Sequence, residues 1–185
     1  MKIPKLIDQV VAVDTETSGP DLFQHKLLTV AFIPVDDKSP RRDFAVKYKN
    51  PLVWGGRGRE FFQQYSKHYE MTAVPPIQFC DDISDYVGSI NQGTIYLLGH
   101  NVSFDNYFLR KVFFEAGRTF PAKISHRTID THSLLFEKCC LKLLDQKYLA
   151  SDEAISLVST ELTGRHTAAY DAEFALKLFQ KLLTI

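Results

Sequence analysis

The sequence predicts an α/β fold in which five short strands combine with helices in a chain of 185 residues. The first observation is the continuous apolar run at residues 10–13, which is typical of a strand buried on both faces. The second is the helical spacing of alanine, leucine and phenylalanine over residues 168–183, which predicts a long amphipathic C-terminal helix. The length suits one ordinary domain, and we interpret residues 1–185 as that single domain.

The first part of the chain predicts three successive strands separated by short turns. Residues 10–17 form the first strand, β-rich residues 26–33 the second, and the alternation of apolar and polar side chains over residues 43–48 the third. This succession favours an antiparallel meander. Residues 50–59 contain a proline and a glycine–arginine run, so we expect a loop there, with a short RNA-binding arginine–glycine tract as the alternative reading.

Helices and two further strands follow in the rest of the chain. Short apolar strands are expected at residues 95–98 and 128–131. Ser103 can cap the helix that follows the first of these strands. We expect helices over residues 60–68, 79–90, 103–116, 133–140, 141–163 and 168–183.

Composition limits the partners and the compartment. Basic and acidic residues number 22 each, so the net charge is zero and provides no overall attraction for nucleic acid. The three cysteines match neither a disulfide framework nor a zinc site, which favours reduced thiols and a cytoplasmic location. Residues 1–8 contain no apolar signal core, and the apolar stretch at residues 27–35 is too short to cross a bilayer, so we expect no membrane partner.

Two carboxylates stand at the end of the first predicted strand. Asp14 and Glu16 are two residues apart, so their side chains point to the same side of the strand. Like charges at the end of a buried strand repel, and a hard divalent cation such as Mg²⁺ or Mn²⁺ is the usual compensation. The alternative is a strand that ends in an ordinary polar turn at residues 17–20.

Two further acids and a histidine fall near predicted helix starts. Asp105 and Asp171 each lie in a first helical turn, and His166 precedes Asp171 by five residues. An acidic side chain in a first turn complements the helix dipole, so each residue taken alone is also explained as an ordinary helix-start residue.

Three segments of the chain match a set of motifs in order. They are VDTETSG at residues 13–19, GHNVSFD at residues 99–105 and HTAAYDA at residues 166–172. Together they resemble the three motifs of the DEDDh 3′–5′ exonucleases. This DnaQ-like family includes the proofreading epsilon subunit of bacterial DNA polymerase III and ribonuclease T. The resemblance spans nearly the whole chain.

The resemblance implies a fold and a set of catalytic residues. The fold would be ribonuclease H-like, a mixed five-stranded sheet flanked by helices. Two Mg²⁺ ions, or two Mn²⁺ ions, would be held by Asp14, Glu16, Asp105 and Asp171. His166 would act as the general base, a task that suits the ordinary pKa of histidine, ~6.5.

The same resemblance implies how a substrate would bind. Thr15, Thr17, Asn101 and Phe104 would meet the 3′-terminal nucleotide, although Phe104 also fits the apolar face of its helix and core packing is the alternative. His100 adjoins the second motif but does not match a family ligand. The implied activity is hydrolysis of DNA or RNA from the 3′ end, preferably of single strands, with release of nucleoside 5′-monophosphates.

Two other functions compete with the exonuclease. One is a catalytically silent nucleic-acid-binding or scaffolding protein of the same fold, which the presence of all five catalytic residues disfavours. The other is a metal-dependent phosphatase that acts on small phosphate esters. The sequence stops at Ile185, soon after the third motif, without a C-terminal segment like the one through which the proofreading subunit holds its polymerase, and a polymerase partner stays an open alternative. These residues set no oligomeric state.

Overall fold

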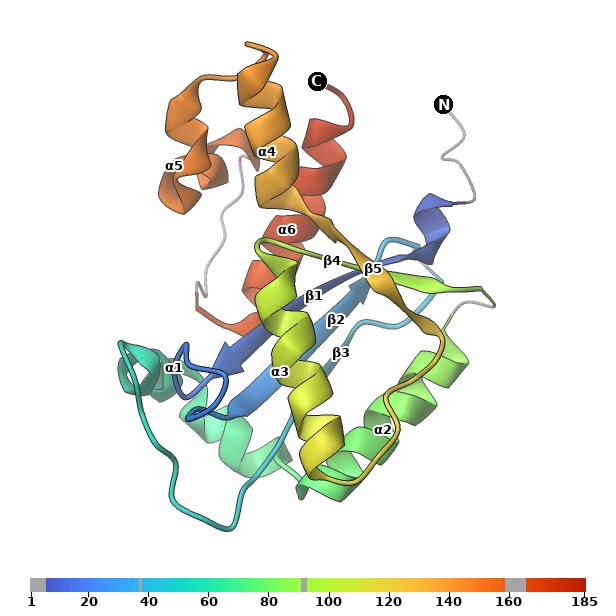
Figure 1. Cartoon of the computed structure of the whole chain (residues 1–185), viewed down its shortest axis with the longest axis vertical. Coiled ribbons are helices and arrows are strands. Elements are labelled where there is room, and N and C mark those ends of the chain that lie inside the picture. Colours follow the sequence, from blue (N-terminus) through green and yellow to red (C-terminus); the bar gives the residue numbers. More distant parts are fainter. Residues whose placement is uncertain (1–5, 37, 91–92, 159–165) are drawn as a thin grey trace.

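The computed structural model of the chain is built around a mixed sheet of five strands with helices on both faces (Figure 1). It describes residues 6–36, 38–90, 93–158 and 166–185. The order of strands across the sheet is β3-β2-β1-β4-β5, so β1 is central. The strands are β1 Val10–Thr17, β2 Leu27–Pro34, β3 Arg42–Ala45, β4 Ile95–Gly99 and β5 Ile124–Asp130.

The pairing of the strands confirms the predicted mixed sheet. β1 pairs with β2 and β2 with β3 in antiparallel fashion, whereas β1 pairs with β4 and β4 with β5 in parallel fashion. Asp14 lies opposite Ala31, Glu16 lies opposite Thr29, and the register shifts directly after Glu16. The regular ladder of β1 therefore ends at the acidic residues.

Helices cover both faces of the sheet, and each helix follows from an apolar stripe in its sequence. Ala172, Leu176 and Phe179 of α6 pack against Val10 and Ala12 of β1 on one face. α2 and α3 bury their apolar residues against the opposite face. The helices are α1 Gly58–Thr72, α2 Pro76–Ser89, α3 Val102–Glu115, α4 Thr131–Cys140, α5 Ser151–Ile155 and α6 Ala168–Leu182, with short 3₁₀ turns at Ile7–Gln9, Gln146–Leu149 and Ser156–Val158.

Several predicted elements differ in extent from the observed ones. β5 begins at Ile124 rather than at residue 128, and α1 covers Gly58–Thr72 rather than residues 60–68. β3 ends at Ala45, and Val46 makes only an isolated bridge with Val74. The predicted helix over residues 141–163 is wrong for its described part, because Lys142 has a left-handed φ of 58° and Asp145 accepts a hydrogen bond from the Lys147 amide in a new turn. Short helical turns follow up to residue 158, and residues 159–163 lie outside the described residues.

The predicted cap of α3 is also wrong. The helix begins at Val102, so Ser103 lies inside it, and the preceding residue Asn101 has a left-handed φ of 67° without a capping side-chain bond. Asparagine tolerates this conformation better than most residues, which permits the sharp turn from β4 into α3. Asp130 at the end of β5 caps α4 instead, because its carboxylate accepts bonds from the amides of His132 and Ser133.

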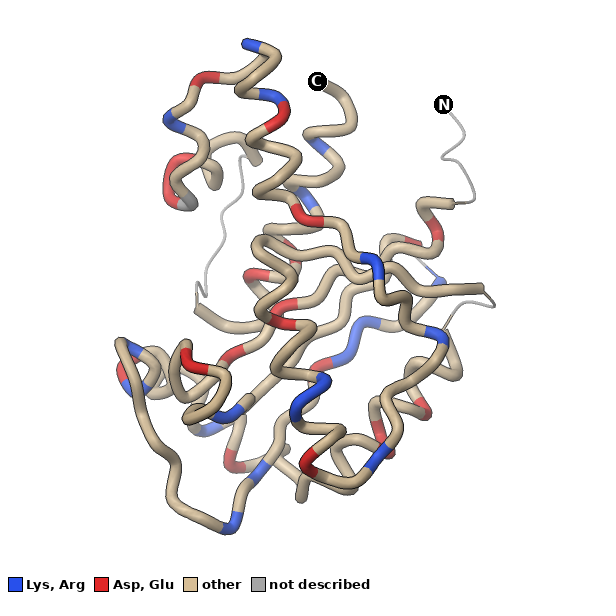
Figure 2. Tube along the Cα trace, in the orientation of Figure 1, with Lys and Arg blue, Asp and Glu red and all other residues tan. Residues whose placement is uncertain are grey.

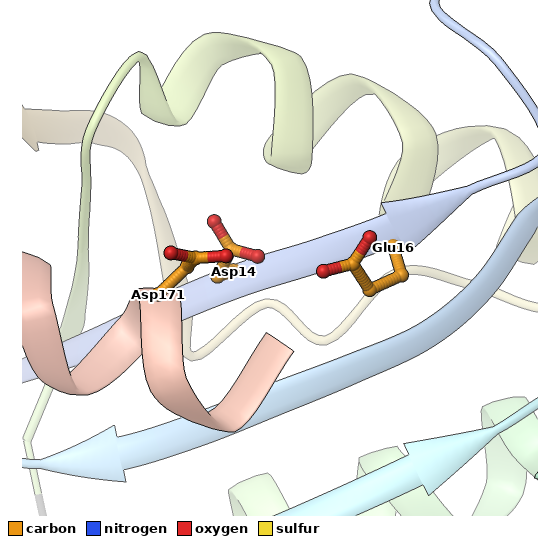
Figure 3. A group of neighbouring side chains, drawn as sticks. All are labelled: Asp14, Glu16 and Asp171. Atoms are coloured by element: carbon orange, nitrogen blue, oxygen red, sulfur yellow. The ribbon is translucent and has the colours of Figure 1, made fainter. Parts of the chain in front are cut away.

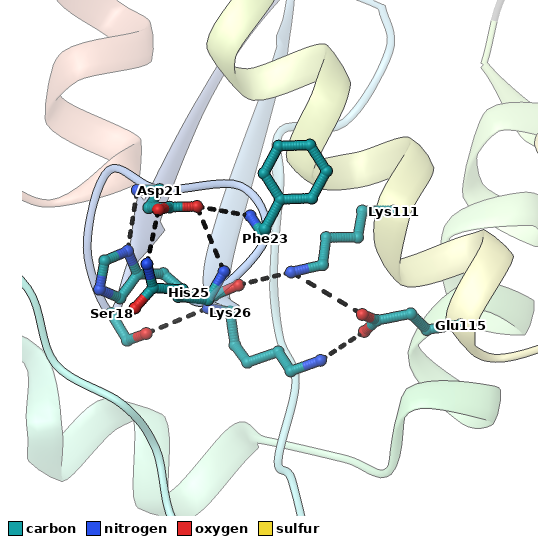
Figure 4. Close-up of polar contacts among 8 residues, drawn as sticks. Ser18, Asp21, Phe23, His25, Lys26, Lys111 and Glu115 are labelled. Atoms are coloured by element: carbon teal, nitrogen blue, oxygen red, sulfur yellow. Dashed lines mark hydrogen bonds and ion pairs between the residues drawn. The ribbon is translucent and has the colours of Figure 1, made fainter.

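The loop between β1 and β2 is closed by hydrogen bonds (Figure 4). The Ser18 amide donates to the Lys26 carbonyl at 2.8 Å, and the Lys26 amide donates to Ser18 Oγ at 3.0 Å. Inside the loop, the Asp21 amide donates to Nδ1 of the buried His25 at 2.8 Å. Lys111 of α3 donates to the His25 carbonyl at 2.7 Å, which attaches the loop to the helix.

Charged residues of both signs are spread over the molecule, in agreement with its zero net charge (Figure 2). The cysteines at positions 80, 139 and 140 are free thiols, as predicted. Within the described part of the chain, no helix combines the length and the apolar character that crossing a bilayer requires.

The first residues of α1 pack directly on the loop after β1. The Gly55 amide donates to the Ser18 carbonyl at 2.8 Å. At Gly58, an added Cβ would lie 2.7 Å from the Ser18 carbonyl oxygen, a distance that backbone atoms cannot accommodate without moving. Only glycine therefore allows α1 to begin so close to the end of β1.

A pair of glycine substitutions tests this close approach. Gly58→Ala should lower the free energy of unfolding by about 1–3 kcal/mol, because the new methyl group overpacks against backbone. Gly88→Ala in α2 should raise it by about 0.5–1 kcal/mol, because nothing lies within 4 Å of the added Cβ and alanine favours the helix. Denaturant unfolding measures both. Equal effects of the two substitutions would show that the contact with Ser18 is unimportant.

Candidate active site

Three carboxylates converge at the end of β1 (Figure 3). Asp14 and Glu16 project from β1 on the face that α6 covers, and Asp171 reaches them from the first turn of α6. One oxygen atom from each of the three lies within 4.8 Å of the other two. The expectation that alternation along a strand places Asp14 and Glu16 on one side is confirmed.

Burial and mutual repulsion raise the pKa values of Asp14 and Glu16. Burial raises the pKa of Asp14 well above its usual range, and the charges of Asp105, Asp171 and Glu16 raise it further. Burial, followed by the charges of Asp171 and Asp105, raises the pKa of Glu16 to about 8. The charged groups that act on Asp14 and Glu16 in this way are all carboxylates, so the cluster is poised to gain from a bound cation.

Asp105 approaches β1 from the other side. It lies in the first turn of α3 with only 3% of its surface exposed, and Thr15 Oγ1 donates a hydrogen bond to its Oδ1 at 2.7 Å. Burial raises its pKa to about 7, although the bond from Thr15 opposes this shift. Asp105 is not one of the three carboxylates that come within 4.8 Å of one another, yet its charge acts on Asp14 and Glu16.

His166 stands at the entrance of α6. Its backbone is left-handed with a φ of 66°, and Thr167 then begins the helix by accepting a hydrogen bond from the Tyr170 amide. This sharp turn brings the imidazole into the pocket that Asp171 also lines. His166, the predicted base, and Asp171, a predicted metal ligand, therefore share one cavity. They lie five positions apart in the sequence.

The carboxylates lie in an open pocket of about 360 Å³. It unites the ends of β1 and β4, the starts of α1, α3 and α6, and the loop after β1. Its lining contains every predicted site residue: Asp14, Thr15, Glu16, Thr17, Asn101, Phe104, Asp105, His166 and Asp171.

The predicted substrate-binding residues take different parts in this pocket. The Thr15 hydroxyl is engaged by Asp105, which leaves the backbone of Thr15 as the part that can meet a ligand. Thr17 Oγ1 donates to the Gly19 carbonyl at 2.8 Å and thereby shapes the pocket wall. Phe104 both packs against the core and lines the pocket, so the two interpretations of this residue describe two parts of one side chain.

The pocket also contains residues outside the predicted set of site residues. Phe61 and Arg57 come from the start of α1, which the sequence placed in or beside a loop. His100 lines the pocket as well, and its Nδ1 lies 3.0 Å from Thr131 Oγ1, while burial and His132 lower its pKa. Arg57 belongs to the glycine–arginine run noted in the sequence, whereas no motif marks Phe61.

The donor set fits a hard divalent cation. Asp14, Glu16 and Asp171 offer only carboxylate oxygens, and all three are half-buried, which suits Mg²⁺ or Mn²⁺ better than metals that prefer nitrogen or sulfur ligands. Asp105 offers a further oxygen beside the same strand. The site thus combines a place for cations, a histidine and an open cavity.

Comparison with known proteins identifies the fold. No sequence-family model and no curated protein sequence matches the chain. Among solved structures, E. coli exonuclease I in complex with a dT13 oligonucleotide superimposes with a TM-score of 0.75 at 15% identity, over 95% of this chain and 40% of that chain. Exonuclease I from Methylocaldum szegediense gives a TM-score of 0.70 at 14% identity, over 94% of this chain and 40% of that chain.

A second kind of protein shares the fold. Pop2p of *S. pombe*, in its Mg²⁺- and Mn²⁺-bound form, gives a TM-score of 0.58 at 15% identity, over 92% of this chain and 81% of that chain. The chain thus spans most of the length of Pop2p but only about two fifths of exonuclease I. The chain therefore has the ribonuclease H-like fold that exonuclease I and Pop2p share.

Proposed function

We propose that the chain is a metal-dependent 3′–5′ exonuclease that removes nucleoside 5′-monophosphates from single-stranded DNA or RNA. The observation that carries the proposal is the convergence of Asp14, Glu16 and Asp171 within 4.8 Å, at the end of the central strand of this fold. Exonuclease I with its bound dT13 oligonucleotide supports single strands as the substrate class. The Mg²⁺- and Mn²⁺-bound form of Pop2p supports the choice of metal.

The carboxylates would hold the metal ions. Asp14, Glu16 and Asp171 would bind one Mg²⁺ or Mn²⁺, and Asp14 together with Asp105 would bind a second. When bound, the ions supply positive charge for the phosphate and acidify the attacking water. The raised pKa values of Glu16 and Asp105 agree with acids that need such charge to stay ionised at neutral pH.

His166 would accept the proton of the attacking water. Its imidazole lines the same pocket as Asp171, on a turn that precedes α6. An imidazole exchanges protons near neutral pH, which suits a general base. The 3′-terminal nucleotide would lie between this histidine and the wall formed by Thr17, Asn101 and Phe104, with the backbone of Thr15 at its end.

Two substitutions separate the proposed roles of ligand and base. Asp14→Asn should reduce cleavage by more than about 100-fold. Loss of a residue that only supports a metal ligand already costs up to about 100-fold, and Asp14 would bind the metal directly. His166→Ala should slow cleavage by about 10²–10⁴-fold, the usual contribution of a general base, and should leave metal binding intact. A gel assay with 5′-labelled single-stranded DNA and RNA in Mg²⁺ or Mn²⁺ measures cleavage, and calorimetry measures metal binding.

Controls for this assay are EDTA and the exposed acid Glu70 of α1, whose change to Gln should alter nothing. Products that shorten from the 3′ end, and disappear with EDTA and with Asp14→Asn, would support the exonuclease. Binding of single strands without cleavage would favour the silent binding protein. Loss of metal binding in His166→Ala would make the histidine a ligand and refute its role as base.

The raised pKa values predict how stability changes with pH. Glu16 titrates at about 8 and Asp105 at about 7 in the folded protein, whereas both titrate near pH ~4 when unfolded. The folded state therefore binds more protons than the unfolded state between these limits, so without metal the free energy of unfolding should fall as pH rises from about 4 to about 8. Thermal or denaturant unfolding in EDTA measures the change.

Bound Mn²⁺ and the substitution Asp14→Asn should each restore the stability that the wild type loses as the pH rises. At pH 8, Mn²⁺ should raise the melting temperature of the wild type, since it neutralises the cluster. Asp14→Asn should be more stable than the wild type in EDTA and should gain little from Mn²⁺, while Glu70→Gln should behave like the wild type. Stability that does not change with pH in EDTA would contradict the proposed repulsion.

A further inference from the structure

The side chain of His166 lies flat on that of Phe61. Their ring centroids are 4.0 Å apart, and the ring planes make an angle of only 13°. Phe61 belongs to the first turns of α1, more than 100 residues before His166 in the sequence, and both rings line the pocket of the three carboxylates. The contact therefore joins α1 directly to the proposed general base.

Phe61 is held firmly relative to the end of β1. Gly58 and Gly55 attach the start of α1 to the Ser18 carbonyl, one residue after the end of β1. Further along the helix, the Tyr69 hydroxyl donates to the Val46 carbonyl at 2.8 Å. The position of the Phe61 ring is thereby tied to the strand that carries Asp14 and Glu16.

An ion pair is built around the same ring. The guanidinium carbon of Arg57 lies 4.7 Å from the centroid of Phe61. Glu60 accepts two hydrogen bonds from Arg57, one from Nε at 2.9 Å and one from Nη2 at 2.6 Å. The first turn of α1 thus holds Arg57 over the aromatic ring and pairs it with Glu60, which is close enough to His166 for the two charges to interact.

A face-to-face contact suits the task of positioning a base. The ring nitrogens of histidine form hydrogen bonds in the plane of the ring, so stacking sets the tilt of the imidazole without using a nitrogen. The aromatic face also attracts an imidazolium, the form that the base takes after accepting a proton. His166 needs such support, because its left-handed backbone is an uncommon conformation for a residue other than glycine.

We propose that Phe61 is a positioning residue, which holds the imidazole of His166 by ring stacking so that a ring nitrogen faces the attacking water. This inference rests on the proposed exonuclease function. It assigns a role in the reaction to α1, whose start lies outside all three sequence motifs.

The neighbouring residue provides a matched control. Phe62 has the same side chain on the same helix, but its ring contacts Trp54, Tyr65 and Tyr69, with centroids 5.2, 5.3 and 5.1 Å away. Phe62→Leu therefore weakens the attachment of α1 without touching His166. Phe61→Leu removes the stacking, and Phe61→Tyr retains it.

The kinetic test compares these variants on single-stranded DNA under saturating Mn²⁺. Phe61→Leu should lower kcat by about 10-fold, less than His166→Ala, because a misplaced base loses only part of its contribution. The KM of Phe61→Leu should stay within about twofold of the wild-type value, and Phe61→Tyr should keep the wild-type kcat. Phe62→Leu should lower the melting temperature but keep kcat. In a His166→Ala background, Phe61→Leu should cause no further loss.

A spectroscopic test does not depend on activity. In NMR spectra, the ring protons of His166, assigned by their absence in His166→Ala, should shift when Phe61→Leu removes the ring current and should keep their position in Phe62→Leu. Unchanged His166 resonances in Phe61→Leu would overturn the inference.

The kinetic outcomes separate this inference from the proposed function. A wild type that cleaves neither DNA nor RNA refutes the exonuclease and the inference with it. If the wild type cleaves and Phe61→Leu matches it, only the inference fails. If Phe61→Leu raises KM by the same factor in the wild type and in His166→Ala, the Phe61 ring binds the nucleotide instead of positioning the base. The inference is then overturned.

Discussion

The repulsion among carboxylates at the end of β1 is the constraint on which the rest of the site depends. β1 is the central strand, buried on both faces by α6 and by α2 with α3. Its last residues nevertheless carry Asp14 and Glu16, and two helices add Asp171 and Asp105. A protein maintains such a cluster at a cost in stability, which a bound cation offsets. The four acids are divided between the two faces of β1. Asp14, Glu16 and Asp171 meet on the face that α6 covers, and Asp105 approaches from the other face.

Close backbone packing builds the wall around this cluster. The loop after β1 is closed between Ser18 and Lys26, and α1 begins against it because Gly58 has no side chain. This packing brings Phe61 under His166, so that a residue from outside the motifs contacts the proposed base. The starts of α1, α3 and α6 and the ends of β1 and β4 therefore form the pocket together.

Much of the fold follows from local patterns. The apolar run before Asp14 and the alternation of Asp14 and Glu16 suffice for a buried strand with two acids on one face, and the spacing from Ala168 predicts α6 to within a residue. Local patterns failed where a single backbone conformation decides the outcome. Lys142 breaks the helix expected over residues 141–163, and the turn at Asn101 lets α3 begin at Val102, one residue before the expected cap at Ser103. Both residues have left-handed backbones, which side-chain periodicity does not encode.

In the candidate site, too, the sequence predicts some features and only the tertiary structure shows the others. The resemblance of three motifs to the DEDDh exonucleases singled out Asp14, Glu16, Asp105, His166 and Asp171, and the structure brings these five side chains to one pocket. The partners of these residues come from tertiary structure. The Thr15 hydroxyl donates to Asp105, and Phe61 meets His166 across more than 100 residues of sequence. Phenylalanine occurs 14 times in the chain, and a phenyl ring carries no chemical mark of its function, so only the packing of α1 on the end of β1 distinguishes Phe61 from the rest.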